Sequence, residues 1–177
     1  YQEYLPGDPA AKRAGNIYPV TCTSSTPPCP IQGFNNSAIT DASVATANYF
    51  GTSGSNDGIN ASDTLAITYS GSSTRTSSGA ASAVPDGSII DCQGTAHALP
   101  RDVADLALSV FYVRTVNGEP ELACIARNSA GTRTSQPVVR GVETMQLMYG
   151  LDTDGSWTTP GTLAPKRWVS AQDVGDW

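Results

Sequence analysis

The chain has 177 residues, 39% of them apolar, and a formal net charge of −6 at pH 7. This length is enough for one domain with a hydrophobic core. The excess of sixteen acidic over ten basic residues argues against a nucleic-acid partner, whose binding needs a basic surface. No apolar run approaches the about 20 residues that span a bilayer, and no leader peptide is visible. We therefore expect a single soluble domain over residues 1–177.

The first 62 residues predict little regular structure. Asp8 followed by Pro9 is a typical helix start, and the AAKRA run predicts a short helix that ends at Gly15. Residues 16–62 are rich in Pro, Ser, Thr and Gly, which favour turns, so a loop-rich segment is expected there. Its oxygen-rich end, Asn56–Asp63, is interpreted as a polar turn.

Residues 63–177 predict an antiparallel sheet. Thr64–Tyr69 alternates apolar with small side chains, which indicates a half-buried strand. The small polar residues of 70–84 predict a mobile loop, and Ser88–Cys92 predicts a short strand. Leu106–Arg114 is largely apolar on both faces, as expected of a central strand.

A hairpin is predicted next, because the Asn-Gly pair in VNGEP (116–120) favours a two-residue turn. Its returning strand is Glu121–Arg127, in which alternate residues share one face. Val138–Tyr149 fits a helix or a strand, and a strand is favoured by its β-branched start, its Gly141 and the alternation of Met145, Leu147 and Tyr149. A sheet of this kind after an N-terminal helical segment gives an α+β fold class.

The four cysteines predict two disulfides in an oxidising compartment. A pairing of Cys22 with Cys29 and of Cys92 with Cys124 suits their spacing, although four cysteines allow three pairings. The alternative is zinc, but neither the C-x6-C gap nor the spacing from Cys92 to His97 fits a zinc site. Disulfides are therefore favoured.

No catalytic arrangement emerges from the sequence. His97 is the single histidine and stands in the loop-like GTAHALPRD, without a Gly-x-Ser-x-Gly elbow to present a serine to it. A solvated histidine is favoured over a general base in a Ser-His-Asp triad. The sequence therefore predicts a protein that is not an enzyme and needs no cofactor.

Two further features have a binding and a structural interpretation. Asp152, Asp154 and the following glycine resemble the opening of a calcium loop, but the twelfth position is Leu163 rather than an acidic residue. An acidic turn is favoured over a metal site. The tryptophans of the last 21 residues could stack on sugars or a partner, yet a cap on the core is favoured. They are Trp157, Trp168 and Trp177.

The C-terminal third carries the most specific pattern. Gln136–Gly155 resembles the signature of PilW-type minor pilins of type IV pili. Ser62–Tyr69, Asp91–Gly94 and Ala11–Cys22 resemble the first strand, the cysteine segment and the end of the pilin helix in that family. The signature positions are Gln136, Pro137, Gly141, Val142, Glu143, Met145, Gln146, Tyr149, Gly150, Asp152, Thr153, Asp154 and Gly155.

The resemblance implies a pilin-like head that acts in pilus assembly and catalyses nothing. It implies a precursor at the periplasmic face of the inner membrane, held only by an apolar N-terminal helix that would precede residue 1, and then a place in the extracellular pilus. The implied partners are other minor pilins and a tip adhesin. The alternative function is a surface adhesin or binding module for a host glycan or protein.

Overall fold

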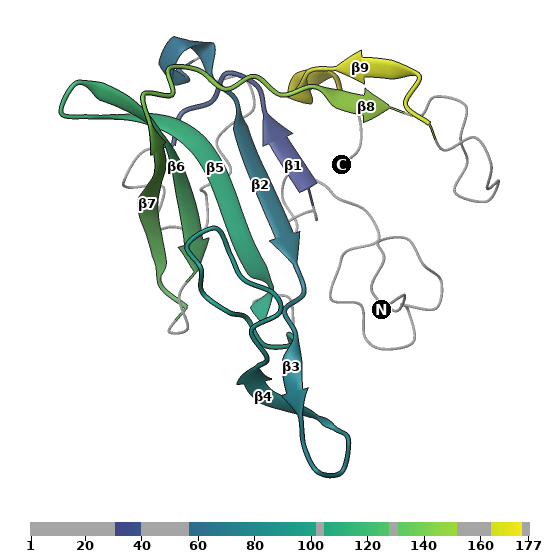
Figure 1. The fold of residues 1–177 in the computed structure, drawn as a ribbon. Coiled ribbons are helices and arrows are strands. Elements are labelled where there is room, and N and C mark those ends of the chain that lie inside the picture. The colour runs from purple at the N-terminus through teal and green to yellow at the C-terminus, as the bar shows by residue number, and fades with distance from the viewer. Residues whose placement is uncertain (1–30, 40–56, 102–104, 128–130, 152–163, 175–177) are drawn as a thin grey trace.

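The computed structural model of the chain describes residues 31–39, 57–101, 105–127, 131–151 and 164–174, and the regular structure of this part is almost entirely strands (Figure 1). The strands are β1 (Ile31–Phe34), β2 (Thr64–Tyr69), β3 (Ser73–Arg75), β4 (Ala81–Pro85), β5 (Ala107–Val116), β6 (Glu119–Arg127), β7 (Arg133–Arg140), β8 (Tyr149–Leu151) and β9 (Arg167–Val169). Two 3-10 turns, η2 (Ile59–Ala61) and η4 (Ala171–Asp173), accompany them.

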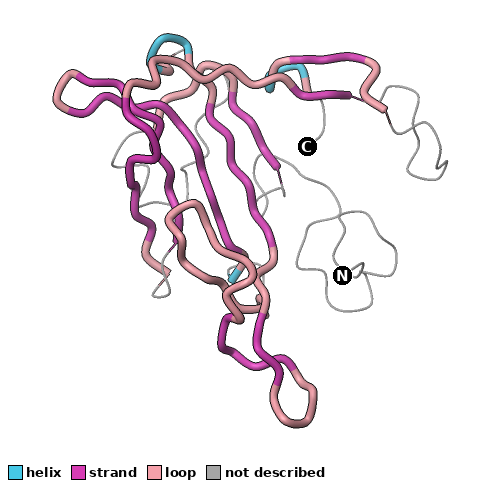
Figure 2. Tube along the Cα trace, viewed as in Figure 1, coloured by secondary structure: helices cyan, strands magenta, loops and turns pink. Residues whose placement is uncertain are grey.

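The α+β prediction is wrong for the described residues, which contain antiparallel sheets and no α-helix, and the short helical pieces drawn in cyan in Figure 2 are 3-10 turns. In this part of the chain, apolar side chains alternate with small or polar ones at a period near two, and turn-forming residues separate the alternating stretches. Such a pattern favours hairpins over helices. The predicted helix of residues 1–15 and the predicted Cys22–Cys29 loop lie outside the described residues. The division of the chain into one domain stays a prediction.

Strand β5 lies at the centre of a five-stranded antiparallel sheet of order β1-β2-β5-β6-β7, as its two apolar faces predicted. The β5–β6 hairpin is closed by Asn117 and Gly118, whose φ angles of 54° and 84° are both positive. Two positive φ angles are required by the turn that matches strand twist, and Asn-Gly adopts them at low cost. The hairpin prediction is therefore confirmed.

One face of this sheet carries the hydrophobic core. Its side chains are fully or almost fully buried and come mainly from β2, β5 and β6: Ile39, Ala66, Leu108, Val110, Tyr112, Ala123 and Ile125. On β2 the small residues of this face, Thr64, Ala66 and Thr68, are more buried than Leu65 and Ile67 on the other face. The apolar face of this alternating strand is therefore not its more buried face.

Residues between β2 and β5 differ most from expectation. The predicted mobile loop at 70–84 contains the hairpin β3–β4, in which Ser73 pairs with Pro85 and Arg75 with Ala81. Side-chain bonds add to the ladder, such as that between the hydroxyls of Thr74 and Ser82 at 2.6 Å. Residues 88–92 form no strand, because Ile90 makes only an isolated bridge with Ala96.

The predicted strand Val138–Tyr149 is confirmed only at its ends. Its start belongs to β7, Gly141 makes a turn with φ 77°, and its last residue opens β8. Between them the chain is extended without a strand ladder, yet Met145, Leu147 and Tyr149 are less exposed than their neighbours. The alternation that carried the prediction is therefore real, although it does not mark one continuous strand.

Candidate functional site

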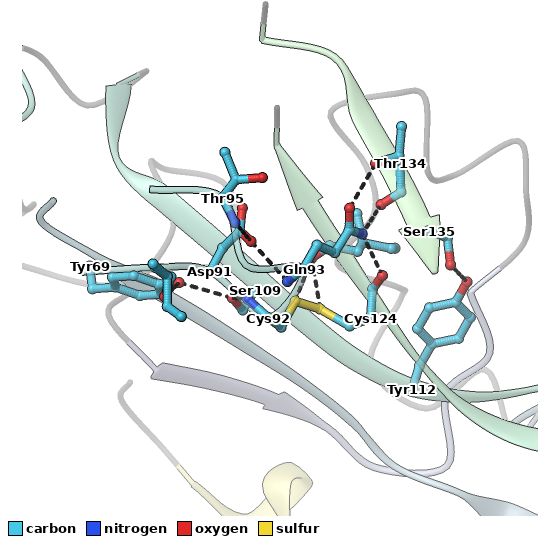
Figure 3. Close-up of a disulfide and its surroundings, with 12 residues drawn as sticks. Tyr69, Asp91, Cys92, Gln93, Thr95, Ser109, Tyr112, Cys124, Thr134 and Ser135 are labelled. Carbon is cyan, nitrogen blue, oxygen red and sulfur yellow. Dashed lines mark hydrogen bonds between the residues drawn. A yellow bond between two sulfur atoms is a disulfide. The ribbon is translucent and has the colours of Figure 1, made fainter. Parts of the chain in front are cut away.

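The disulfide between Cys92 and Cys124 is present and fastens the loop of residues 86–99 to strand β6 (Figure 3). Gln93 extends this attachment, because its amide nitrogen donates to the carbonyl oxygens of Cys124 at 2.9 Å and Thr134 at 2.8 Å. Thr134 returns a bond of 3.0 Å from its hydroxyl to the Gln93 side chain. Loop, β6 and β7 are thus held as one unit by a covalent bond and three hydrogen bonds.

His97 is not the solvated residue that the sequence predicted. Its ring is largely buried, and Nε2 lies 2.9 Å from an Asp91 carboxylate oxygen. The other oxygen of Asp91 accepts the backbone N–H groups of Gln93 at 2.8 Å and Thr95 at 3.0 Å. No serine or threonine hydroxyl of the described residues bonds the ring, so the Asp91–His97 pair shapes a loop and does not complete a Ser-His-Asp triad.

A pocket of about 450 Å³ borders His97, and its lining includes residues of β4 and the last residue of β6. Its walls are mostly small or apolar, and its charged members are Arg101, Asp105 and Arg127. Asp105 accepts the backbone N–H of Arg101 at 3.2 Å, so one carboxylate oxygen is engaged in holding the loop. The pocket holds none of the signature residues.

The described signature residues form one continuous path instead. Gln136 and Pro137 lie on β7, which pairs only with β6 among the described strands, and the register shifts by one residue beside Pro137. An edge position next to a bulge tolerates proline, which has no N–H to donate. Gly141 then turns the chain and donates its N–H to the carbonyl of Pro120 at 2.8 Å, in the β5–β6 hairpin.

After this turn the signature segment, defined here as Val142–Tyr149, is bonded to residues 60–63. The carbonyl oxygen of Met145 accepts a hydrogen bond from the backbone N–H of Asp63 at 2.8 Å. The backbone N–H of Met145 donates to the Ser62 hydroxyl at 3.2 Å. On either side, Asn60 donates to the Glu143 carbonyl at 2.9 Å and Gln146 donates to the Ala61 carbonyl. Segments more than 80 residues apart in sequence are thereby joined.

Asp63 is the centre of this attachment. Its side chain is buried, and its two carboxylate oxygens accept the backbone N–H groups of Asn36 at 2.9 Å and Leu147 at 2.8 Å. A buried carboxylate is costly unless such donors satisfy it. The local sequence indicates only a polar turn at Asp63, because neither of its hydrogen-bond partners is close to it in sequence.

Tyr149 enters the same environment from β8. Burial, with a smaller contribution from the negative charge of Asp63, raises the pKa of the Tyr149 phenol from 10.0 to about 12. Both effects disfavour the phenolate. The signature tyrosine is therefore neutral at physiological pH and acts as part of the packing between the segment and the sheet.

The stability of the protein at alkaline pH should reveal the raised pKa of Tyr149. Below pH 10.0 Tyr149 is neutral in both the folded and the unfolded chain, but between pH 10.0 and about 12 the unfolded chain ionises first. The free energy of unfolding should therefore fall across this interval, and by less in Tyr149→Phe than in the original protein. Urea unfolding at the two ends of the interval measures the difference, and equal pH slopes would contradict the assignment.

Gly150, another signature residue, allows close packing within the β8–β9 hairpin. A Cβ at this position would lie 2.7 Å from Pro165 Cβ and 3.4 Å from the Trp168 ring. Gly150 is paired directly with Trp168 across the hairpin. The glycine thus leaves room for a proline and a tryptophan to cover the strand, an arrangement in which an aromatic ring shields a strand glycine.

Adding a methyl group there should loosen the hairpin. We expect Gly150→Ala to destabilise the protein by about 1–3 kcal/mol, the usual cost of overpacking, and to speed amide hydrogen exchange in β8 and β9. Gly79→Ala is a suitable control, because its Cβ meets open space and only its φ of 83° causes strain. Unchanged exchange in the hairpin of Gly150→Ala would show that the packing is not tight.

Several predicted residues lie outside the described part of the chain: Cys22, Cys29, Asp152, Asp154, Trp157 and Trp177. Within the described part, no group of three His, Cys, Asp or Glu side chains could hold a metal ion. Trp168 is described, and 63% of its surface is exposed, so the prediction that it caps the core is wrong. No helix among the described residues has the length and apolar character needed to cross a membrane.

Comparison with known proteins bears on the same region. Residues 110–177 match the family described as PilW, type IV pilus-assembly protein W. The matched region begins within β5 and contains the disulfide partner Cys124, the signature segment and the β8–β9 hairpin. No curated protein and no solved structure matches the chain. The PilW-type resemblance predicted from Gln136–Gly155 is therefore confirmed.

Proposed function

We propose, from the premise that the chain carries the PilW-type pilus-assembly sequence, that it is a structural minor pilin of a type IV pilus. The family match over residues 110–177 carries this proposal. In the same proposal, the head packs against other minor pilins and a tip adhesin in the priming or tip complex. The precursor would stand at the periplasmic face of the inner membrane before it enters the pilus.

The use of the signature residues supports a structural role. Gly141, Met145 and Gly150 serve backbone bonds or close packing, and Tyr149 is a buried neutral phenol. None of these positions presents a nucleophile, base or metal ligand to the pocket beside His97. Signature residues that hold the head in one conformation suit a protein that acts by packing against neighbouring subunits.

The disulfide is consistent with the proposed location. Structural disulfides persist in oxidising compartments such as the periplasm and the cell surface and are rare in the cytosol. Cys92–Cys124 joins a loop to a central sheet strand and is flanked by the Gln93 bonds, as in a permanent cross-link. It would keep the head folded after export from the cytosol.

Gene deletion tests the proposal. A deletion strain should lose surface pili in electron micrographs and lose twitching motility, and the full-length gene supplied in trans should restore both. Introducing the gene with His97→Gln, whose amide nitrogen can still donate to Asp91, should restore piliation as well, because the histidine would hold a loop and not act in catalysis. Normal pili in the deletion strain would refute the proposed role.

A further inference from the structure

One wall of the pocket beside His97 is fixed to the chain around the start of β3. The backbone N–H of Ser72 donates to the His97 carbonyl at 2.9 Å, and the N–H of Leu99 donates to the Ser73 hydroxyl at 2.8 Å. Gly71 packs so closely against the same wall that a Cβ there would collide with the His97 carbonyl oxygen. The wall is therefore fixed by contacts within the protein, as in binding sites that are largely pre-formed.

The loop that carries this wall is also attached through its side chains. The Asp91 carboxylate accepts two backbone N–H groups of the loop and lies 2.9 Å from the His97 ring. The neighbouring Cys92 is joined to β6 by the disulfide (Figure 3). A pocket whose wall is held in this way loses little conformational entropy when a small molecule binds.

Two side chains of opposite charge line the pocket, those of Arg101 and Asp105. The Asp105 carboxylate accepts the backbone N–H of Arg101 at 3.2 Å, which keeps the carboxylate beside the start of the arginine. No ion pair joins the two side chains, although other ion pairs are present in the described part of the chain. The pocket therefore offers a cation and a carboxylate that lie near each other and are not joined.

The other described walls of the pocket are mainly apolar. Leu99 belongs to the fixed loop, Leu106 directly precedes β5, and Ala83 and Pro85 belong to β4. Apolar walls with a few charged groups are the usual composition of a small-molecule site, and such sites have volumes of about 300–1,000 Å³. The pocket, at about 450 Å³, has both properties.

We infer that this pocket binds a free α-amino acid with an aliphatic side chain. The guanidinium of Arg101 holds the carboxylate of the ligand, the second oxygen of Asp105 holds its ammonium group, and the leucines pack on its side chain. The two charges of an α-amino acid are one carbon apart, whereas the ends of an extended peptide move apart by about 3.3–3.6 Å per residue. Two charged groups that belong to neighbouring points of one loop match the first arrangement.

A ligand with a single charge suits the pocket less well. A plain carboxylate is attracted by Arg101 and by Arg127, which also lines the pocket, but it is repelled by Asp105. A plain amine is attracted by Asp105 and repelled by the arginines. In an amino acid each charge meets its opposite, so the pocket selects by repulsion of the wrong ligands as well as by attraction of the right one.

Leucine and two analogues that each lack one of its charges test the inference. We expect L-leucine to bind the purified 177-residue chain at least about 10-fold more tightly than isocaproate, which lacks the ammonium group, or isoamylamine, which lacks the carboxylate. Glycine lacks the aliphatic side chain and should also bind more weakly. Isothermal titration calorimetry measures the four affinities. No detectable binding of leucine, or equal binding of leucine and either analogue, would overturn the inference.

Substitution of the two charged residues assigns the binding to this pocket. Arg101→Gln should weaken leucine binding at least about 10-fold and should not weaken the binding of isoamylamine, which has no carboxylate for the guanidinium. Asp105→Asn keeps an oxygen for the Arg101 N–H and should weaken leucine by a similar factor, but not isocaproate. Arg75→Gln is the matched control, because Arg75 donates to the Gly79 carbonyl on the β3–β4 hairpin and is not part of the pocket. Equal affinities of Arg101→Gln and Arg75→Gln for leucine would refute the site.

Thermal unfolding separates lost binding from lost folding. Leucine should raise the melting temperature of the original protein and of Arg75→Gln but not that of Arg101→Gln, whose transition without leucine shows that it is folded. Amino-acid binding is additional to the proposed assembly role and does not depend on it. A failure of leucine binding leaves the assembly role standing, and normal pili in the deletion strain leave the binding site standing.

Discussion

Replacing Asp63 with alanine is expected to lower the free energy of unfolding by about 2–4 kcal/mol. The buried carboxylate accepts two backbone N–H groups, from Asn36 and Leu147, and its loss would leave both donors without this partner. Each buried donor left unsatisfied costs about 1–3 kcal/mol. Asp63→Asn keeps an acceptor oxygen and should cost less than alanine.

The location of the effect is as informative as its size. Because Asp63 joins residues 36 and 147, hydrogen exchange should quicken in the signature segment Val142–Tyr149 and at the turn after β1. Glu119→Ala removes a carboxylate from an exposed position on the β5–β6 hairpin and serves as the control. Denaturant unfolding of the two variants measures the difference, and equal stabilities would show that Asp63 is not the anchor.

Removing the Cys92–Cys124 disulfide should have an effect at least as large. The bond joins residues with a sequence separation of 32, and closing a loop of that size stabilises the folded chain by about 3–4 kcal/mol in the chain-entropy account. The double variant Cys92→Ser, Cys124→Ser should therefore melt roughly 10 °C lower. Thermal unfolding followed by circular dichroism measures this shift.

Two comparisons make the disulfide result specific. Treating the original protein with reductant should lower its melting temperature to that of the double variant. The double variant lacks this disulfide, so reductant has no Cys92–Cys124 bond to break in it. Gln93→Ala removes the hydrogen bonds beside the disulfide and keeps the cross-link, so it should cost less than the double variant. A double variant as stable as the original protein would show that the Gln93 bonds alone hold the loop.

The elements that could be predicted from the sequence are those that depend on residues close together in the chain. The β5–β6 hairpin follows from the Asn117-Gly118 turn and the apolar residues on either side of it. The central position of β5 follows from its two apolar faces. By contrast, small polar residues at 70–84 predicted a loop, but backbone pairing and hydroxyl bonds between neighbours make them the β3–β4 hairpin.

The candidate site was predictable as a sequence pattern and not as an arrangement. Gln136–Gly155 indicated the PilW family, yet nothing local pointed to Asp63 as its anchor or to Trp168 as an exposed ring over Gly150. His97 was interpreted without Asp91, although the two are only six residues apart. A side chain's partner depends on how the loop folds back, which alternation and composition do not encode.

By itself the amino-acid sequence indicated the central antiparallel strands, the tight turn between β5 and β6 and the resemblance of the C-terminal region to PilW-type proteins, whereas the structure chose Cys92–Cys124 among the possible cysteine pairings. These features depend on side-chain alternation, on the dihedral preferences of Asn and Gly, and on residue patterns read along one stretch. Tertiary structure alone decided which face of β2 is more deeply buried and that residues 60–63 hold residues 143–147. Contacts between segments more than 80 residues apart depend on the energy of the whole packed fold, so no local stretch of the chain specifies them.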